Sequence, residues 1–259
     1  MLSGIDEAGR GSIIGPLIIV GVTLNHDPLN NLINDGLKDS KLFLSSTGRI
    51  KRAKLALKIQ KMALESKIIE ISAKEIDNTL KKRPSDNLNL LEIRKIAQLI
   101  LDLSSTDITI DTLSLPHYSK NHLISYLYAY EKSLRVVNES CESESCFFSL
   151  RYPSGITKKV LISKKADRVY PIVSAASCVA KHLRDQSLRE IEYEWNLLPN
   201  CLGQGYPNET DTQLMNFLKK YQKEIRKHKF PFIRYTWAWP PLQKIIQPPQ
   251  NTIDKFLNK

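Results

Sequence analysis

The fold of this chain is most constrained by two adjacent acidic residues that precede an apolar segment. The chain opens with Ser3-Gly-Ile-Asp-Glu-Ala-Gly-Arg-Gly11, and an apolar run from Ile13 to Leu24 follows. The apolar run predicts a buried strand, yet burying Asp6 and Glu7 beside it is costly unless a cation compensates their charge. A divalent metal ion would remove that cost, and the two flanking glycines would let the backbone approach a ligand closely. We therefore interpret this segment as half of an active site.

Length and composition place the chain among soluble globular proteins. Its 259 residues can form one large domain or two small ones, and apolar residues make up 42% of them. The net charge of +11 at pH 7 favours a polyanionic partner, of which nucleic acid is the commonest. A charge surplus that serves only solubility is the alternative.

No targeting or membrane segment is predicted. Charged residues precede the first apolar run, which is unlike a signal peptide. That run has 12 residues, too few to cross a bilayer, and contains Gly15, Pro16 and Gly21. We expect a soluble cytoplasmic protein without a membrane partner.

The four cysteines predict no disulfide framework. Cys141, Cys146, Cys178 and Cys201 lack paired C-x-x-C spacing. We expect four reduced thiols, with pairing or metal binding of the first two as the alternative.

Hydrophobic periodicity predicts an α/β layer architecture, because strands come first and helices are interleaved with later strands. Expected strands cover residues 13–24, 67–72, 107–111, 136–137 and 160–162, and expected helices cover 45–65, 87–103, 119–132, 171–195 and 211–225. The polar, serine-rich segment 138–159 has the composition of an excursion from the core. The proline-containing residues 238–259 have the composition of a tail.

Four acidic residues are candidates for one site: Asp6, Glu7, Asp111 and Asp167. Asp6 and Asp111 lie at or near predicted strand ends, where catalytic groups converge in open α/β sheets, and Asp167 precedes a helix opened by Pro171. Neighbouring strand residues face opposite ways, so Asp6 and Glu7 can both reach the site only if the strand distorts there. Spacing alone does not join the four residues, and Asp111 and Asp167 could be ordinary turn or cap residues.

Several collinear motifs are spread over residues 1–237. They are Gly4-Ile-Asp-Glu-Ala-Gly-Arg-Gly11, Asp39-Ser-Lys41, Lys165-Ala-Asp167, Tyr170-Pro-Ile-Val-Ser-Ala-Ala-Ser177, Gly203-Gln-Gly-Tyr-Pro207 and Phe232-Ile-Arg-Tyr-Thr-Trp237. The first five closely resemble the motifs of ribonuclease HII, and the last resembles its archaeal branch. The resemblance implies a ribonuclease H-like fold with a mixed central sheet flanked by helices. It divides the catalytic domain into a core over about 1–195 and a helical C-terminal region over about 196–237.

The resemblance also implies the chemistry. Asp6, Glu7, Asp111 and Asp167 would hold two Mg²⁺ or Mn²⁺ ions, and the enzyme would hydrolyse the RNA strand of RNA–DNA hybrids. It would also cut 5′ of ribonucleotides embedded in duplex DNA, leaving 5′-phosphate and 3′-hydroxyl ends. Two departures from the family pattern stand out. Ser12 replaces a common proline, and the spacing from Asp111 to Asp167 is longer, which we interpret as a surface hairpin or loop insertion at 138–159.

The same resemblance implies the substrate contacts. The backbone of Gly9, Arg10 and Gly11 would bind the ribose 2′-hydroxyl, and Tyr206 would pack on the sugar at the RNA–DNA junction. Lys41 and Ser174 are candidate phosphate contacts. A turn aromatic at position 206 and a solvated lysine at position 41 are the alternatives. The basic run 219–229 and the basic face of helix 45–65 could likewise face phosphate or only solvent.

The C-terminal tail resembles a sliding-clamp-binding peptide. Gln250, Ile253, Phe256 and Leu257 have its spacing, which places three apolar side chains on one side of a helical turn. A tail that docks on its own domain is the alternative. For the whole chain, we weigh a ribonuclease HII against a ribonuclease HIII, whose additional N-terminal domain we do not see, and against a non-catalytic hybrid-binding or clamp-recruited adaptor. We expect a monomer.

Overall fold

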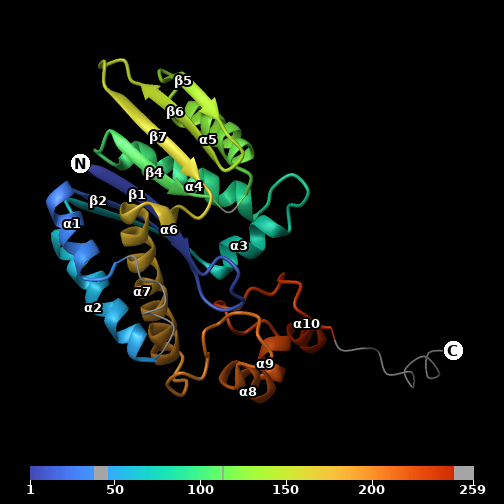
Figure 1. Cartoon of the computed structure of the whole chain (residues 1–259). Helices are drawn as coiled ribbons and strands as arrows, with labels where there is room; N and C mark the ends of the chain where they lie inside the picture. Colours follow the sequence, from blue (N-terminus) through green and yellow to red (C-terminus); the bar gives the residue numbers. More distant parts are fainter. Residues whose placement is uncertain (38–45, 113, 248–259) are drawn as a thin grey trace.

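The computed structural model describes residues 1–37, 46–112 and 114–247 (Figure 1). Its strands are β1 (Leu2–Ala8), β2 (Leu17–Leu24), β3 (Glu65–Ile71), β4 (Asp107–Asp111), β5 (Arg135–Cys141), β6 (Ser145–Arg151) and β7 (Thr157–Ser163). Its helices are α1 (His26–Asn34), α2 (Ser46–Met62), α3 (Ala73–Leu80), α4 (Leu88–Asp102), α5 (Pro116–Tyr130), α6 (Ala166–Val169), α7 (Pro171–Glu194), α8 (Thr212–Lys220), α9 (Gln222–Arg226) and α10 (Pro240–Ile246).

The strands form one mixed sheet in the order β3-β2-β1-β4-β7-β6-β5. The central pairs β1–β4 and β4–β7 are parallel, whereas β2 and β3 on one side and β6 and β5 on the other pair antiparallel. Parallel central strands need crossover helices, and α4 and α5 supply them. The expected α/β class with a mixed central sheet is confirmed.

Helices cover both faces of the sheet (Figure 1). Strand residues alternate between two cores with the period of two that a pleated strand imposes. On β2, Leu17 and Ile19 pack with apolar residues of α3, α4 and α5, and Ile18 and Val20 pack with those of α1, α2 and α7. A third core joins the C-terminal helices to the turn before β2, through Ile14.

Local signals explain why the helices near the site begin where they do. The Asn87 side chain accepts a hydrogen bond from the Leu90 amide at 3.1 Å and caps α4. Proline occupies the first turn of α7, where its missing N–H costs nothing. These starting points fix how α4 and α7 approach opposite faces of β1.

The segment 138–159 contains the expected hairpin, formed by β5 and β6, but this hairpin is not an excursion from the core. It forms the end of β5, the whole of β6 and the start of β7, and it therefore extends the main sheet instead of leaving the core. Phe148 and Leu150 are fully buried against the helices α4 and α5. The polar residues that suggested an excursion lie mainly on exposed β5 and in the turn after it.

The expectation of four reduced thiols is also wrong. Cys141 and Cys146 are directly opposite each other in the β5–β6 ladder, with Cα atoms 4.1 Å apart, and they form a disulfide. Cys178 and Cys201 are free. The pairing depends on the strand register, which spacing alone does not reveal.

Three other boundaries differ from expectation. The strand expected over 13–24 begins only at Leu17, because residues 9–16 form a turn. The helix expected over 211–225 divides at Tyr221 into α8 and α9. The region expected to be a tail from residue 238 still packs, since Trp239 and Leu242 are buried in the third core.

Candidate active site

The candidate site lies at the carboxyl ends of the parallel strands β1 and β4. Asp6 follows the last residue of β1 that pairs with β4, and Asp111 is the last residue of β4. On both strands the flanking isoleucines, such as Ile5 and Ile110, face the core under α4. Asp6 and Asp111 therefore face the side that α7 covers.

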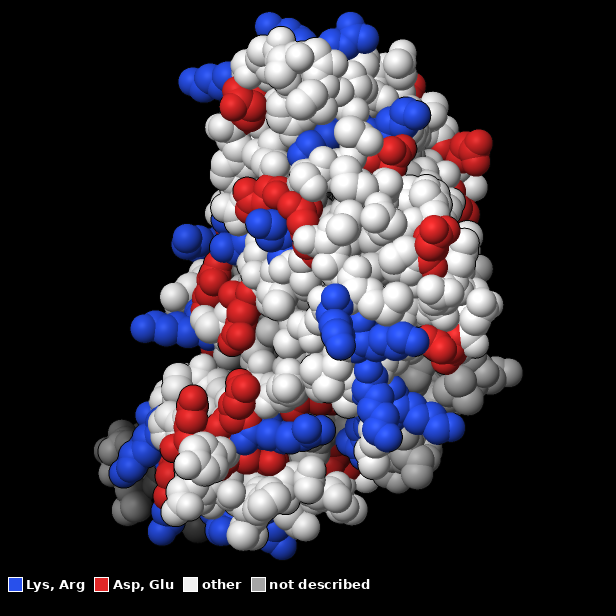
Figure 2. All heavy atoms as spheres, turned by 90° about the vertical axis from the view of Figure 1, so that its left-hand side faces the viewer, with Lys and Arg blue, Asp and Glu red and all other residues white. Residues whose placement is uncertain are grey.

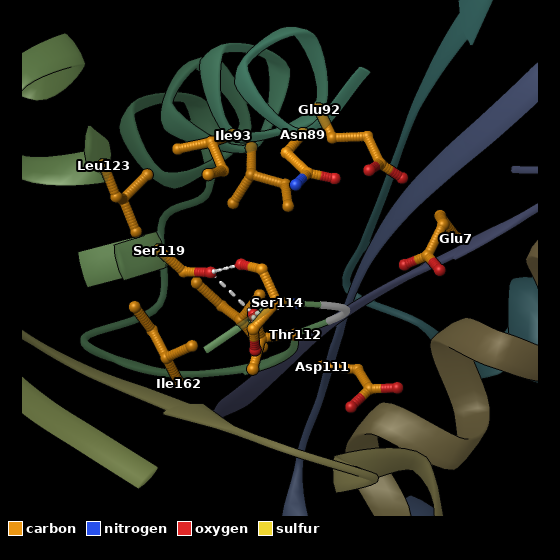
Figure 3. A pocket seen from close by; sticks show the side chains of 12 residues that line it. Glu7, Asn89, Glu92, Ile93, Asp111, Thr112, Ser114, Ser119, Leu123 and Ile162 are labelled. Carbon is orange, nitrogen blue, oxygen red and sulfur yellow. Dashed lines mark hydrogen bonds between the residues drawn. The ribbon is translucent and has the colours of Figure 1, made fainter. Parts of the chain in front are cut away.

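Glu7 faces the other side of the sheet. Strand β1 pairs with β2 in unbroken register through Ala8, so the distortion that would turn Glu7 towards Asp6 is not present. Glu7 instead lines a pocket under α4 with Glu92, and Asp111 lies at its edge (Figure 3). The two acidic side chains thus leave β1 on opposite faces, but at the strand end they are close enough for Asp6 and Asp111 both to repel Glu7.

Asp167 joins the site through a short turn. Lys165 adopts a left-handed conformation with φ of 54°, and this turns the chain into α6, which carries Asp167. The Ala166 amide donates a 2.8 Å hydrogen bond to Asp111 Oδ1. The Ser174 hydroxyl donates to the Asp167 carbonyl oxygen and so ties α7 to this turn.

Burial and mutual repulsion disfavour the ionised carboxylates. Burial, with repulsion from Asp111, raises the pKa of Asp6 to about 7, against hydrogen bonding by Ser177 and attraction by Lys181. Burial and the charges of Asp6, Glu92 and Asp111 raise the pKa of Glu7 well above its usual range. Burial and then repulsion from Asp167 raise the pKa of Asp111, although the Ala166 amide opposes this.

These carboxylates suit a hard divalent cation. Their donor atoms are oxygens only, which Mg²⁺ and Mn²⁺ prefer, and their raised pKa values show that protein cations compensate them incompletely. Among the described residues, no three His, Cys, Asp or Glu side chains lie close enough together to share one ion. The repulsions link Glu7 to Asp6 and to Asp111, Asp6 to Asp111, and Asp111 to Asp167, so Asp111 is the neighbour that the other three acids share.

A turn rich in glycine follows the acidic pair. Gly9 has φ of +86°, which favours glycine, and its amide donates to the Tyr206 hydroxyl at 3.2 Å. Arg234, which is fully buried, donates to the carbonyl oxygens of Gly9 and Arg10 at 2.7 Å each and of Gly15 at 3.0 Å. The turn is therefore held in place by Tyr206 and Arg234, which lie 197 and 225 residues after Gly9 in the sequence.

The Arg10 side chain points to α4. Its Nε donates to Glu92 Oε2 at 2.7 Å, and its terminal nitrogen donates to Asn89. Burial raises the pKa of Glu92, while the charge of Arg10 opposes that rise. Sequence reasoning missed Glu92 and Arg234, because Glu92 reads as an ordinary helix residue and Arg234 as part of a C-terminal motif. The signal that identifies both residues is the burial of their charged side chains, which exists only in the folded chain.

Two groups of expected site residues are not among the residues that the structure describes. They are Lys41, in the gap at 38–45, and the tail peptide of Gln250, Ile253, Phe256 and Leu257. Tyr206 is described, and its side chain is 40% exposed beside the glycine turn. In the described part of the chain, no helix is long and apolar enough to cross a membrane.

The fold and the acids at its strand ends define the class of protein. Similar solved structures include a ribonuclease H2 from Pyrococcus horikoshii, with a TM-score of 0.67, 27% identity and coverage of 94% of this chain and 96% of that one. Another is the PCNA:RNase HII complex from Archaeoglobus fulgidus, with a TM-score of 0.67, 25% identity and coverage of 99% and 100%. The chain has the ribonuclease H-like fold.

The family follows from the sequence comparisons. A family model described as Ribonuclease HII matches residues 3–239. A ribonuclease HII from Pyrococcus furiosus is 32% identical over 100% of this chain and 99% of its own length, and one from Methanosphaera stadtmanae is 34% identical over 90% of each. The chain belongs to the ribonuclease HII family, and it is a nuclease that acts on RNA–DNA hybrids. Likeness to a Bst-RNase HIII, at 15% identity and a TM-score of 0.67, extends to the fold alone.

Proposed function

We propose that this ribonuclease is an endonuclease that cuts on the 5′ side of a ribonucleotide embedded in duplex DNA, as well as within longer hybrids. It leaves a 5′-phosphate and a 3′-hydroxyl. The observation that carries the proposal is the hydrogen bond from the Gly9 amide to the Tyr206 hydroxyl. This bond joins a backbone turn that could bind a ribose hydroxyl to an exposed aromatic ring, directly after the acids Asp6 and Glu7.

The acidic residues supply the reaction centre. Asp6, Glu7, Asp111 and Asp167 would hold two Mg²⁺ or Mn²⁺ ions, which activate a water molecule and stabilise the leaving 3′-oxygen when bound. The chain's own contribution is positioning. The Ala166 amide orients Asp111, and the Glu7 amide donates to Asp6 Oδ1 at 2.8 Å.

Backbone amides in the glycine turn are available for the 2′-hydroxyl. The Gly9 amide is used by Tyr206, and the Gly9 and Arg10 carbonyl oxygens are used by Arg234. Within the described residues, the amides of Arg10 and Gly11 have no acceptor. A hydroxyl that accepts from these amides would distinguish RNA from DNA, because the 2′-hydroxyl is the group that DNA lacks.

Tyr206 is proposed to contact the sugar on the DNA side of the junction. Its ring is 40% exposed, and a Cβ added to Gly11 would lie 4.0 Å from it. A sugar bound at the Arg10 and Gly11 amides would therefore have the ring as its neighbour. Lys41 and Ser174 stay predicted phosphate contacts, although the Ser174 hydroxyl already donates to Asp167.

A sliding clamp is the proposed protein partner. The tail carries Gln250, Ile253, Phe256 and Leu257 with the spacing of a clamp-binding peptide. A similar solved structure is the PCNA:RNase HII complex from Archaeoglobus fulgidus, and the matching chain of that structure aligns with 99% of this chain. We propose that the tail binds the clamp and brings the nuclease to replicated DNA.

The test uses an end-labelled DNA duplex with one ribonucleotide, incubated with Mg²⁺, with Mn²⁺ or with chelator. We expect one cut on the 5′ side of the ribonucleotide that depends on metal. Cleavage of long hybrids alone would contradict the junction role of Tyr206. Tight binding without any cleavage would contradict the nuclease and favour the adaptor.

A further inference from the structure

A second polar pocket lies between α2 and α7, beside the candidate active site. It is lined by Ala8, Arg49, Arg52, Lys181, Arg184, Asp185, Gln204 and Tyr206. Ala8 directly follows the acidic pair, and Tyr206 is the ring proposed to mark the junction. On the face on which α1 and α2 lie, a group of Lys and Arg side chains stands to the right of centre in the lower half, with Asp and Glu side chains to its left (Figure 2). The pocket therefore connects the reaction centre to a basic surface.

The pocket carries a surplus of positive charge. Among the described residues that line it, four side chains are cationic and Asp185 is the one carboxylate. Arg52 Nη2 pairs with Asp185 Oδ2 at 2.6 Å, and this uses the carboxylate that lines the pocket among the described residues. Lys181 Nζ donates to the neutral Ser177 hydroxyl at 2.8 Å. About three positive charges thus remain to attract an anion.

Two guanidinium groups also have unused hydrogen-bond donors. Arg184 is 3% exposed, and its Nε and Nη1 have no partner among the described residues, while Nη2 donates to the Ile14 carbonyl oxygen. The Nε of Arg52 is buried and likewise without a partner in the described part of the chain. A buried charged donor without an acceptor is costly, so these groups favour an occupant that brings acceptor oxygens.

The backbone packs closely around Arg184. Gly9 and Gly205 have φ of +86° and +72°, and a Cβ added to either would lie within 3.0 Å of the Arg184 side chain. The guanidinium is therefore held rigidly under the turn that carries the proposed 2′-hydroxyl contacts. A planar guanidinium that is already held in place can donate two parallel hydrogen bonds to the oxygens of a phosphate. Little side-chain entropy is then lost on binding.

We infer that this pocket binds a backbone phosphate of the DNA segment that follows the ribonucleotide. The inference rests on the proposed function, because it places the occupant next to Tyr206 on the DNA side of the junction. Arg49 and Lys181 supply charge at the mouth, and Arg52 and Arg184 supply buried donors. A free phosphate or nucleotide has the same chemistry and is the competing source of the anion.

The test combines a protein variant with a modified substrate. Arg49 is exposed, so Arg49→Gln removes one charge from the pocket mouth without disturbing the core. Lys61→Gln removes the same charge from the other end of α2, at an exposed position that does not line the pocket. Neutral methylphosphonates replace the phosphates one at a time on the DNA side of the ribonucleotide, and anisotropy measures binding in chelator.

We expect one methylphosphonate to weaken binding to wild type and Lys61→Gln about tenfold, and binding to Arg49→Gln much less. Arg49→Gln should also lower the slope of log Kd against log salt by about 1. Equal penalties in all three proteins at every position would overturn the inference. Inhibition by inorganic phosphate that Arg49→Gln alone relieves, without any methylphosphonate effect, would also overturn it in favour of free phosphate.

The binding readout keeps this result separate from the proposed function. If wild type fails to cut the single-ribonucleotide duplex, the proposed function fails whatever the binding shows. If it cuts normally while the methylphosphonate scan shows no difference between Arg49→Gln and Lys61→Gln, only the phosphate pocket is refuted.

Discussion

Replacing Asp6 with asparagine should stabilise the metal-free protein while it abolishes cleavage. Asp6 is 5% exposed, and burial raises its pKa from 3.8 to about 7. A carboxyl whose pKa is higher in the folded state costs no stability below its unfolded pKa. It lowers stability progressively as the pH rises from about 4 through about 7. Asparagine removes this cost, and its oxygen can still accept from the Glu7 amide.

The magnitude follows from the size of the shift. A rise of about 3 pKa units at about 1.4 kcal/mol each gives roughly 4 kcal/mol of destabilisation at pH 8. At pH 5 much of this cost is absent, because Asp6 is protonated in the folded state. The advantage of Asp6→Asn should therefore grow by about 2 to 3 kcal/mol between pH 5 and pH 8.

Chemical denaturation in chelator at several pH values measures this advantage. Glu209→Gln, which alters an exposed loop carboxylate, serves as the control and should show no such growth. Saturating Mg²⁺ should then stabilise wild type by about 2.7 kcal/mol at a hundred times its Kd, and Asp6→Asn by much less. An Asp6→Asn protein that gains nothing over wild type at pH 8 in chelator would refute the reasoning.

Three further predictions concern recognition. Tyr206→Ala should lower cleavage at a single ribonucleotide more than tenfold, and unchanged activity would remove its proposed junction role. Glu92→Gln deletes the charge that holds Arg10 at 2.7 Å, so kcat/KM on the same substrate should fall several-fold, about tenfold at most. An unaltered kcat/KM would show that the Arg10 anchor is dispensable. Phe256→Ala should weaken binding to the clamp about tenfold by calorimetry and leave cleavage of free duplex unchanged, and wild-type affinity would end the tail assignment.

Much of the fold was predictable because its central elements have strong local signals. Alternating residues predicted β4 over 107–111, and the proline start predicted α7. The strand pairing of 138–159 was not predictable in the same way. Its outer strand β5 is largely exposed, and only the inward-facing Phe148 and Leu150 of β6 record its place in the sheet.

In the candidate site, too, part of the arrangement was predictable from the sequence and part was not. The acids at positions 6, 7, 111 and 167 were found from motif resemblance. In the structure Asp6 and Asp111 face the side that α7 covers, Asp167 interacts with Asp111, and Glu7 interacts with both Asp6 and Asp111 from the other face. The groups that support them come from other segments. Glu92 and Arg234 act through burial and long-range hydrogen bonds, which no local pattern encodes.

The hydrogen bond from Arg234 to Gly9 joins residues that are 225 positions apart in the sequence, and this separation has a consequence for folding. Contacts between distant residues require a large loop of chain to close first, so they form more slowly than local ones. The acids of the opening motif lie in β1, which pairs directly with β2, whereas the substrate turn after them is completed only when Arg234 docks. The substrate turn should therefore be acquired later in folding than the strand that carries the acids.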